Sequence, residues 1–208
     1  MPRLFSIKPP ITLKGRKFRG VRGWAGKPTH PPLTDFPIVA YVLAAVFDVI
    51  SYFAWKGSQP EVSSLAHDSF VAATYVMVAG GVVSLGAAIT GFWDWWKGIE
   101  RERTGLIGRA KHTQVWRTIN WHATIMLTVT GIVALTIVLR LLRYGEGYTN
   151  LAVMILSVIA GLLVSLGATY GGSLVYDYQF NVESLEGSTA WDETERDQLP
   201  AEHTTSEW

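Results

Sequence analysis

The chain reads VAATYVMVAGGVVSLGAAITGF at residues 71–92, a stretch without a single charged side chain. An amphipathic helix of a soluble protein keeps a charged face, so a charge-free run of this length indicates a membrane span. Residues 151–170 are charge-free as well. We therefore expect an all-α, integral membrane four-helix bundle over residues 34–176, with helices at about 36–55, 70–96, 116–142 and 151–176.

Basic side chains are segregated along the chain and predict its orientation. Residues 1–33 carry eight lysines and arginines and no acid, and the loop between the second and third helices carries five more basic residues. Basic excess marks cytoplasmic segments, so the N-terminal arm and this loop are expected in the cytoplasm. Four spans then return the C-terminal tail, residues 177–208, to the same side.

The two tails are opposite in charge. The basic arm is broken by glycine and proline; it either sets the topology or binds anionic lipid headgroups or an acidic partner. The C-terminal tail holds nine acidic residues against Arg196, a composition typical of a solvated face. Because both tails are expected on one side, they can pair with each other or with neighbouring subunits.

The chain contains no cysteine. This excludes thioether-attached haem, cysteine-ligated iron–sulfur clusters, thiol catalysis and disulfides. A redox centre would have to be non-covalent and held through histidine. No motif for hydrolysis or nucleotide binding is found, and the basic arm lacks a nucleic-acid-binding fold. Nucleic acid is therefore not an expected partner, and an independent enzyme is poorly supported.

One segment recurs within the chain. Residues 79–87 read AGGVVSLGA and residues 160–168 read AGLLVSLGA, with seven identities in nine. Small residues recur wherever membrane helices pack closely, which explains the echo by itself. A second interpretation is a duplicated two-helix hairpin, with the copies related by an axis along the membrane normal. The second and fourth helices would then be the inner, tightly packed pair, and the contact glycines would be Gly80, Gly86, Gly161 and Gly167.

Histidines supply the candidate cofactor ligands. His122 lies about 9 Å into the third helix, where a polar side chain must face protein or a cavity. It either binds a haem iron or a metal, or makes a structural hydrogen bond between helices. His30 is expected on the same side, just before the first helix, where a bend at the next two prolines would bring it to His122. His112 and Asp35 complete the metal-ligand set, although His112 would project about 80° away from His122.

Two further carboxylates border or enter the membrane. Asp94 lies at the expected cytoplasmic boundary beside the histidines. Asp48 lies about 18 Å along the first helix from Phe36, past the middle of the bilayer. Its partner would be a serine or threonine of a neighbouring helix, or Arg140 reaching from the outer end. Asp48 is either a group for proton transfer or a neutral or hydrogen-bonded structural aspartate.

Three short motifs stand out, namely HPPLTDFP at 30–37, GFWDW at 91–95 and GGSLVY at 171–176. They resemble motifs of the bacterial membrane protein family called domain of unknown function 2231. Members typically open with His-Pro-x-Leu-x-His-Phe-Pro, end helix two with Gly-Phe-x-Asp-Trp and close with Gly-Gly-x-Leu-Val-Tyr. Asp48 and His122 are similar to the family's first-helix aspartate and third-helix histidine.

The resemblance covers about residues 30–180 and implies a four-helix protein of the bacterial inner membrane. It also implies a redox neighbourhood, because such domains occur beside Rieske-type or cytochrome c modules. One position departs from the pattern: the family's second histidine in the opening motif is Asp35 here. A haem or metal site that relied on that histidine would be lost or altered.

These observations predict an anchor or accessory subunit of a respiratory or photosynthetic electron-transfer complex. The subunit would contact the lipid bilayer and protein partners, and would hold a b-type haem or a metal at His30 and His122 on the cytoplasmic side. The alternative function is a small transporter or proton-conducting protein that uses Asp48.

Overall fold

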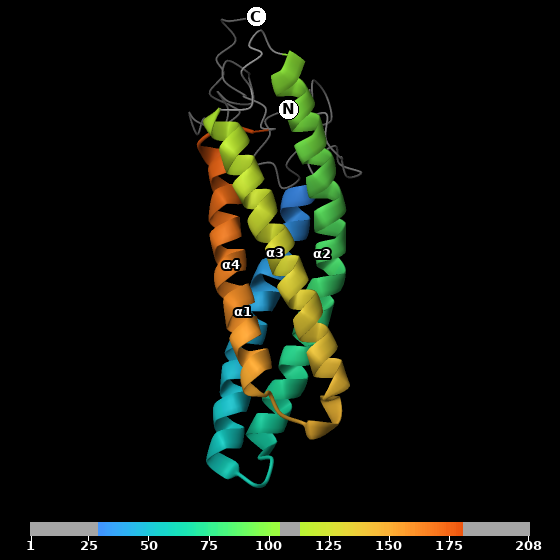
Figure 1. The fold of residues 1–208 in the computed structure, drawn as a ribbon, viewed down its shortest axis with the longest axis vertical. Helices are drawn as coiled ribbons and strands as arrows, with labels where there is room; N and C mark the ends of the chain where they lie inside the picture. The colour runs from blue at the N-terminus through green and yellow to red at the C-terminus, as the bar shows by residue number, and fades with distance from the viewer. Residues whose placement is uncertain (1–28, 105–112, 181–208) are drawn as a thin grey trace, which may run out of the picture.

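Four long helices form a single up-and-down bundle (Figure 1). The computed structural model describes residues 29–104 and 113–180. The helices are α1 (His30–Ser58), α2 (Ser64–Thr104), α3 (Gln114–Leu142) and α4 (Leu151–Tyr176), with a short 3-10 helix, η2 (Tyr144–Glu146), between α3 and α4. All four long helices contain a segment long and apolar enough to cross a membrane. The expected all-α membrane bundle is confirmed.

The helices are arranged so that α1 and α3 face each other diagonally. α1 packs against α2 and α4, and α3 packs against α4 and, less closely, against α2. α1 and α3 begin at one end of the bundle, the end where α2 and α4 finish (Figure 1). We call this the histidine end, because His30 and His122 lie there, and the opposite end the ion-pair end. The first and second hairpins, α1–α2 and α3–α4, therefore run in the same direction.

The glycines of α2 and α4 pack against α1 and α3. A Cβ at Gly80 would lie 2.8 Å from Ala40 Cβ, and one at Gly161 would lie 3.4 Å from Ala45 Cβ, both on α1. A Cβ at Gly167 would lie 2.6 Å from Met126 Sδ on α3. The expectation that the second and fourth helices form an inner pair is therefore wrong. Small residues let two helix backbones approach, but here the glycines of α2 and α4 pack against α1 and α3 and not against each other.

The helix starts follow from local chemistry. The Thr113 side chain accepts a hydrogen bond from Trp116 N, and Asn150 accepts one from Val153 N, so α3 and α4 begin at N-caps. α1 begins at His30, with prolines in its first turn, where proline fits because no amide donor is needed. The expectation that His30 precedes its helix is therefore wrong. The apolar run alone marked the start at Phe36 and overlooked this proline-led turn.

The centre of the bundle is an apolar layer. It is formed by Tyr41 on α1, Met77 on α2, Val129 and Val133 on α3 and Val164 on α4, each at most 2 % exposed. Many large apolar side chains point outward instead, as expected of a surface that faces lipid. The apolar layer separates two polar layers, one at the histidine end and one at the ion-pair end.

Candidate functional site

The histidine end holds the two residues expected to bind a cofactor. His30 is the first residue of α1, and its Nδ1 donates a hydrogen bond of 2.9 Å to the carbonyl oxygen of Ala87 on α2. Thr90 Oγ1 lies 3.4 Å from the same nitrogen. Since α1 starts at His30, the ring lies at the end of this helix and is hydrogen-bonded to the neighbouring helix.

His122 repeats this arrangement in the second hairpin. It lies on α3, and its Nδ1 donates a hydrogen bond of 2.8 Å to the carbonyl oxygen of Gly167 on α4. A carbonyl oxygen can only accept, so Nδ1 carries the proton in both rings. In the neutral form the lone pair of each ring is then on Nε2, which is the nitrogen left to act as a ligand.

Glycines make room for both rings. A Cβ at Gly91 would lie 2.6 Å from Cε1 of His30, and one at Gly171 would lie 3.1 Å from Cε1 of His122. Both glycines lie one helical turn beyond the residue whose carbonyl accepts from the histidine. Each ring is thus held by a carbonyl and a glycine of the other helix in its hairpin. In the sequence these glycines stand out only as the first residues of the GFWDW and GGSLVY motifs.

The two rings meet across the bundle. Their centroids are 6.4 Å apart and their planes make an angle of 81°. A metal–nitrogen bond is about 2 Å, and a ring centre lies about 1 Å behind its nitrogen, so two imidazoles on opposite sides of one metal ion have centroids about 6 Å apart. The observed separation lies in the range of an ordinary edge-to-face ring contact and is also close to the separation of two imidazoles that bind one metal ion. The backbone acceptors on Nδ1 are the outer partners that metal-binding histidines use.

The other expected metal ligands do not join this pair in the described residues. Asp35 is exposed on α1, so the departure from the family pattern at this position lies outside the pair. Asp94 is buried on α2 at 8 % exposure, and His112 lies outside the described residues. Within the described side chains of residues 29–96 and 113–180, no group of three or more His, Asp or Glu residues is arranged to hold a metal ion.

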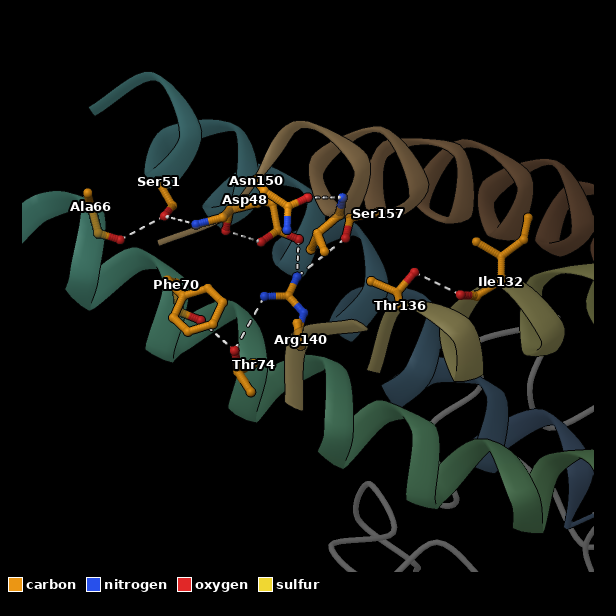
Figure 2. Close-up of polar contacts among 12 residues, drawn as sticks. Asp48, Ser51, Ala66, Phe70, Thr74, Ile132, Thr136, Arg140, Asn150 and Ser157 are labelled. Carbon is orange, nitrogen blue, oxygen red and sulfur yellow. Dashed lines mark hydrogen bonds and ion pairs between the residues drawn. The ribbon is translucent and has the colours of Figure 1, made fainter. Parts of the chain in front are cut away.

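The ion-pair end is organised around Asp48 and Arg140. The guanidinium of Arg140 on α3 pairs with the carboxylate of Asp48 on α1, and the two side chains are fully buried (Figure 2). Arg140 Cζ also lies 5.7 Å from the centroid of the Phe70 ring. Among the candidate partners that the sequence offers, Arg140 is therefore the one that reaches Asp48 as an ion.

Hydroxyl groups surround this pair. Thr149 Oγ1 donates to Asp48 Oδ1 at 2.7 Å, while Arg140 donates to Thr74 Oγ1 at 3.3 Å and to Ser157 Oγ at 3.4 Å. Ser51 ties the loop to the same site, because it accepts from Thr149 N and donates to the Ala66 carbonyl. Figure 2 shows these contacts converging from all four helices and the loop before α4. Thr149 was missed from sequence because it lies in that loop.

Both polar layers are built on one stripe of each diagonal helix. His30 precedes Asp48, and His122 precedes Arg140, by the same 18 residues. Eighteen residues are five turns of an α-helix, about 27 Å. His30 and Asp48 therefore lie on one face of α1, and His122 and Arg140 lie on one face of α3. This spacing was the sequence signal that could have linked His30 with His122 and Asp48 with Arg140.

Comparison with known proteins gives one family. A family model described as "Predicted membrane protein (DUF2231)" matches residues 26–184, which is most of the chain. The chain therefore belongs to the DUF2231 family, as the resemblance of its motifs predicted. No curated protein and no solved structure matches it.

Proposed function

We propose that this DUF2231 protein is an electron-transfer subunit of a membrane complex, with a b-type haem held between His30 and His122. The observation that carries the proposal is the separation of 6.4 Å between two imidazoles whose Nδ1 atoms are both bound to carbonyls. The pair spans the two hairpins, so a bound cofactor would also join them.

Haem suits this donor set better than a bare metal ion. A structural metal ion is usually held by four protein ligands, and the described residues offer no group of three. Haem brings its own equatorial nitrogens, so two histidines suffice. Bound there, it would supply a reversible one-electron couple. The chain's contribution would be to present two Nε2 atoms, hold each ring through its Nδ1–H bond and keep water from the adjoining apolar layer.

We also propose an orientation with both tails in the cytoplasm of a bacterial cell. The basic residues of the arm and of the middle loop support it, and α1 starts and α4 ends at one end of the bundle (Figure 1). The basic arm and the acidic tail would then be available to anionic lipid or to a respiratory or photosynthetic partner. The histidine pair would lie at this cytoplasmic boundary.

The alternative of proton transport through Asp48 gains no support from the geometry. The Asp48 carboxylate is bound by Arg140 and Thr149. The layer of Tyr41, Val129 and Val133, which is apolar except for the buried Tyr41 hydroxyl, lies between it and the histidine end. A proton on Asp48 would have to break a buried ion pair and then cross this layer, which is costly on both counts.

The test is a reduced-minus-oxidised visible spectrum of the protein purified in mild detergent, with haem and metal analysis of the same sample. Near-stoichiometric haem is expected, with the band lost in both His30→Ala and His122→Ala. His67→Ala is the matched control, because His67 lies at the ion-pair end against Gly147. Protein that contains no haem after expression with excess haem precursor would refute the proposal.

A further inference from the structure

The two hairpins are built on one plan. Positions on α1 and α3 correspond at a separation of 92 residues, which relates His30 to His122 and Asp48 to Arg140. Buried positions follow the same register, with Tyr41 matching Val133. The further buried pairs at this separation are Pro37 with Val129 and Ala44 with Thr136.

α2 and α4 correspond in the same way, at a separation of 80 residues. The glycines under the two histidines, Gly91 and Gly171, are related by it. So are the pairs of buried residues Ala73 with Val153, Met77 with Ser157, Gly80 with Ala160 and Ala87 with Gly167. The repeated AGxxVSLGA segment is offset by 81 residues, one more than this register. The common plan therefore rests on burial and spacing and not on that segment.

An approximate two-fold axis along the bundle follows from this plan. α1 and α3 lie diagonally and run in one direction (Figure 1), so equivalent residues face each other across the axis. At the histidine end the two facing residues are identical. At the ion-pair end they are opposite in charge, and both are fully buried.

This difference bears on which hairpins can pair. In a symmetric pairing the same surface meets itself, so residue i faces residue i of the copy when it lies at the axis. Two first hairpins would bury Asp48 against Asp48, and two second hairpins would bury Arg140 against Arg140. Two buried arginines would both remain charged, and two buried aspartates would have to take up a proton, so both pairings are destabilising. Only a first hairpin with a second hairpin gives a neutral pair without a change of protonation.

We propose that Asp48 and Arg140 form a recognition element by which the α1–α2 hairpin selects an α3–α4 hairpin in the membrane and rejects a second copy of itself. The surrounding hydroxyls fit this role. Thr149, Thr74 and Ser157 contact the pair through their side-chain oxygens, and a hydroxyl can donate or accept. These hydroxyls can therefore bind a carboxylate or a guanidinium at either position. The selectivity depends on the opposite charges of Asp48 and Arg140.

The first experiment is charge reversal in the full-length chain. Asp48→Arg and Arg140→Asp alone each bury two like charges, and we expect the thermal midpoint in detergent to fall by about 10 °C or more. The double variant with both changes should recover most of that loss. The control is the exposed pair of Arg143 with Glu146, whose double reversal should leave the midpoint unchanged. A double Asp48→Arg, Arg140→Asp variant no more stable than the single variants would overturn the proposal.

The second experiment separates selection of a partner from stability alone. Chains carrying Asp48→Arg and chains carrying Arg140→Asp are co-expressed with different tags. Neither variant has opposite charges at positions 48 and 140 within its own chain. The first hairpin of each chain can pair with the second hairpin of the other, where the charges are opposite, so 1:1 dimers with exchanged hairpins should co-purify. Two wild-type chains, each satisfied internally, should not exchange. Co-purification of the variants at the wild-type level would refute the selective role of the pair.

Discussion

The two polar layers of this bundle lie on the same faces of α1 and α3, but their side chains interact in opposite ways. At the ion-pair end, Asp48 and Arg140 bind each other and three hydroxyls, and both are fully buried. At the histidine end, His30 and His122 are each held through Nδ1, while their ring centres remain 6.4 Å apart. Asp48 and Arg140 neutralise each other, although Nε of Arg140 is buried without a hydrogen-bond partner among the described residues. In the proposed function, the second nitrogens of the two imidazoles are the atoms that would bind the haem iron.

The largest effect is expected from breaking the ion-pair end. Asp48→Ala would leave Arg140 buried without a counter-charge, and the free energy of unfolding should fall by about 3–5 kcal/mol. Titration with denaturing detergent measures this. Arg143→Ala is the control, since Arg143 is half-exposed and pairs with Glu146 at the surface, and it should change stability by less than about 1 kcal/mol. Equal effects of the two substitutions would mean that the buried pair contributes no more to stability than the surface pair.

A smaller effect is expected from crowding the histidine end. Gly91→Ala would place a methyl group 2.6 Å from Cε1 of His30, and overpacking of this kind costs about 1–3 kcal/mol. Where the haem-bound state bears this cost, haem affinity should fall by about 5- to 150-fold, measured by haem titration. Gly171→Ala, whose methyl would lie at 3.1 Å, should lose less, and Gly131→Ala, which meets nothing within 4 Å, should lose nothing. The reverse order of effects would show that the rings are not held by these glycines.

The hydroxyl shell is predicted to contribute less again. Thr149→Val removes the hydrogen bond of 2.7 Å to Asp48 Oδ1 at nearly constant volume, and should lower the free energy of unfolding by about 1.5 kcal/mol. Thr149→Ser keeps the hydroxyl and is the matched control. Haem content should be the same in both, because the histidine end lies about 27 Å away. A haem loss specific to Thr149→Val would show that the two layers are coupled.

The smallest effect is expected where the chain departs from its family. Asp35→His restores the family's histidine, but residue 35 is exposed on α1, so the spectrum and the haem stoichiometry should not change. A second band, or haem that survives His30→Ala only in the Asp35→His background, would show that this position can supply a ligand. The same spectra would then compare residues 30 and 35 as haem ligands.

The bundle itself could be predicted from sequence because a charge-free run of about 20 residues spans a bilayer and lacks the polar face of a soluble helix. The pairing of His30 with His122 could be anticipated from their common side of the membrane. Its geometry could not be, because the start of α1 at His30 depends on prolines that fit a first helical turn. The packing of α2 and α4 was predicted wrongly, since small residues show that a helix packs closely but not against which neighbour. The sequence offered Arg140 as one partner of Asp48 among several, and the common spacing of 18 residues is the signal that would have selected it.

α2 is longer than its neighbours and rises beyond the histidine end (Figure 1). From Gly91, which underlies His30, to Thr104 it continues for 13 residues, about 20 Å of helix. Among the described helices, α2 therefore projects beyond the start of α3, which itself lies eight residues, about 12 Å, before His122. A partner that approached the imidazoles along the bundle axis would meet the end of α2 first among these helices.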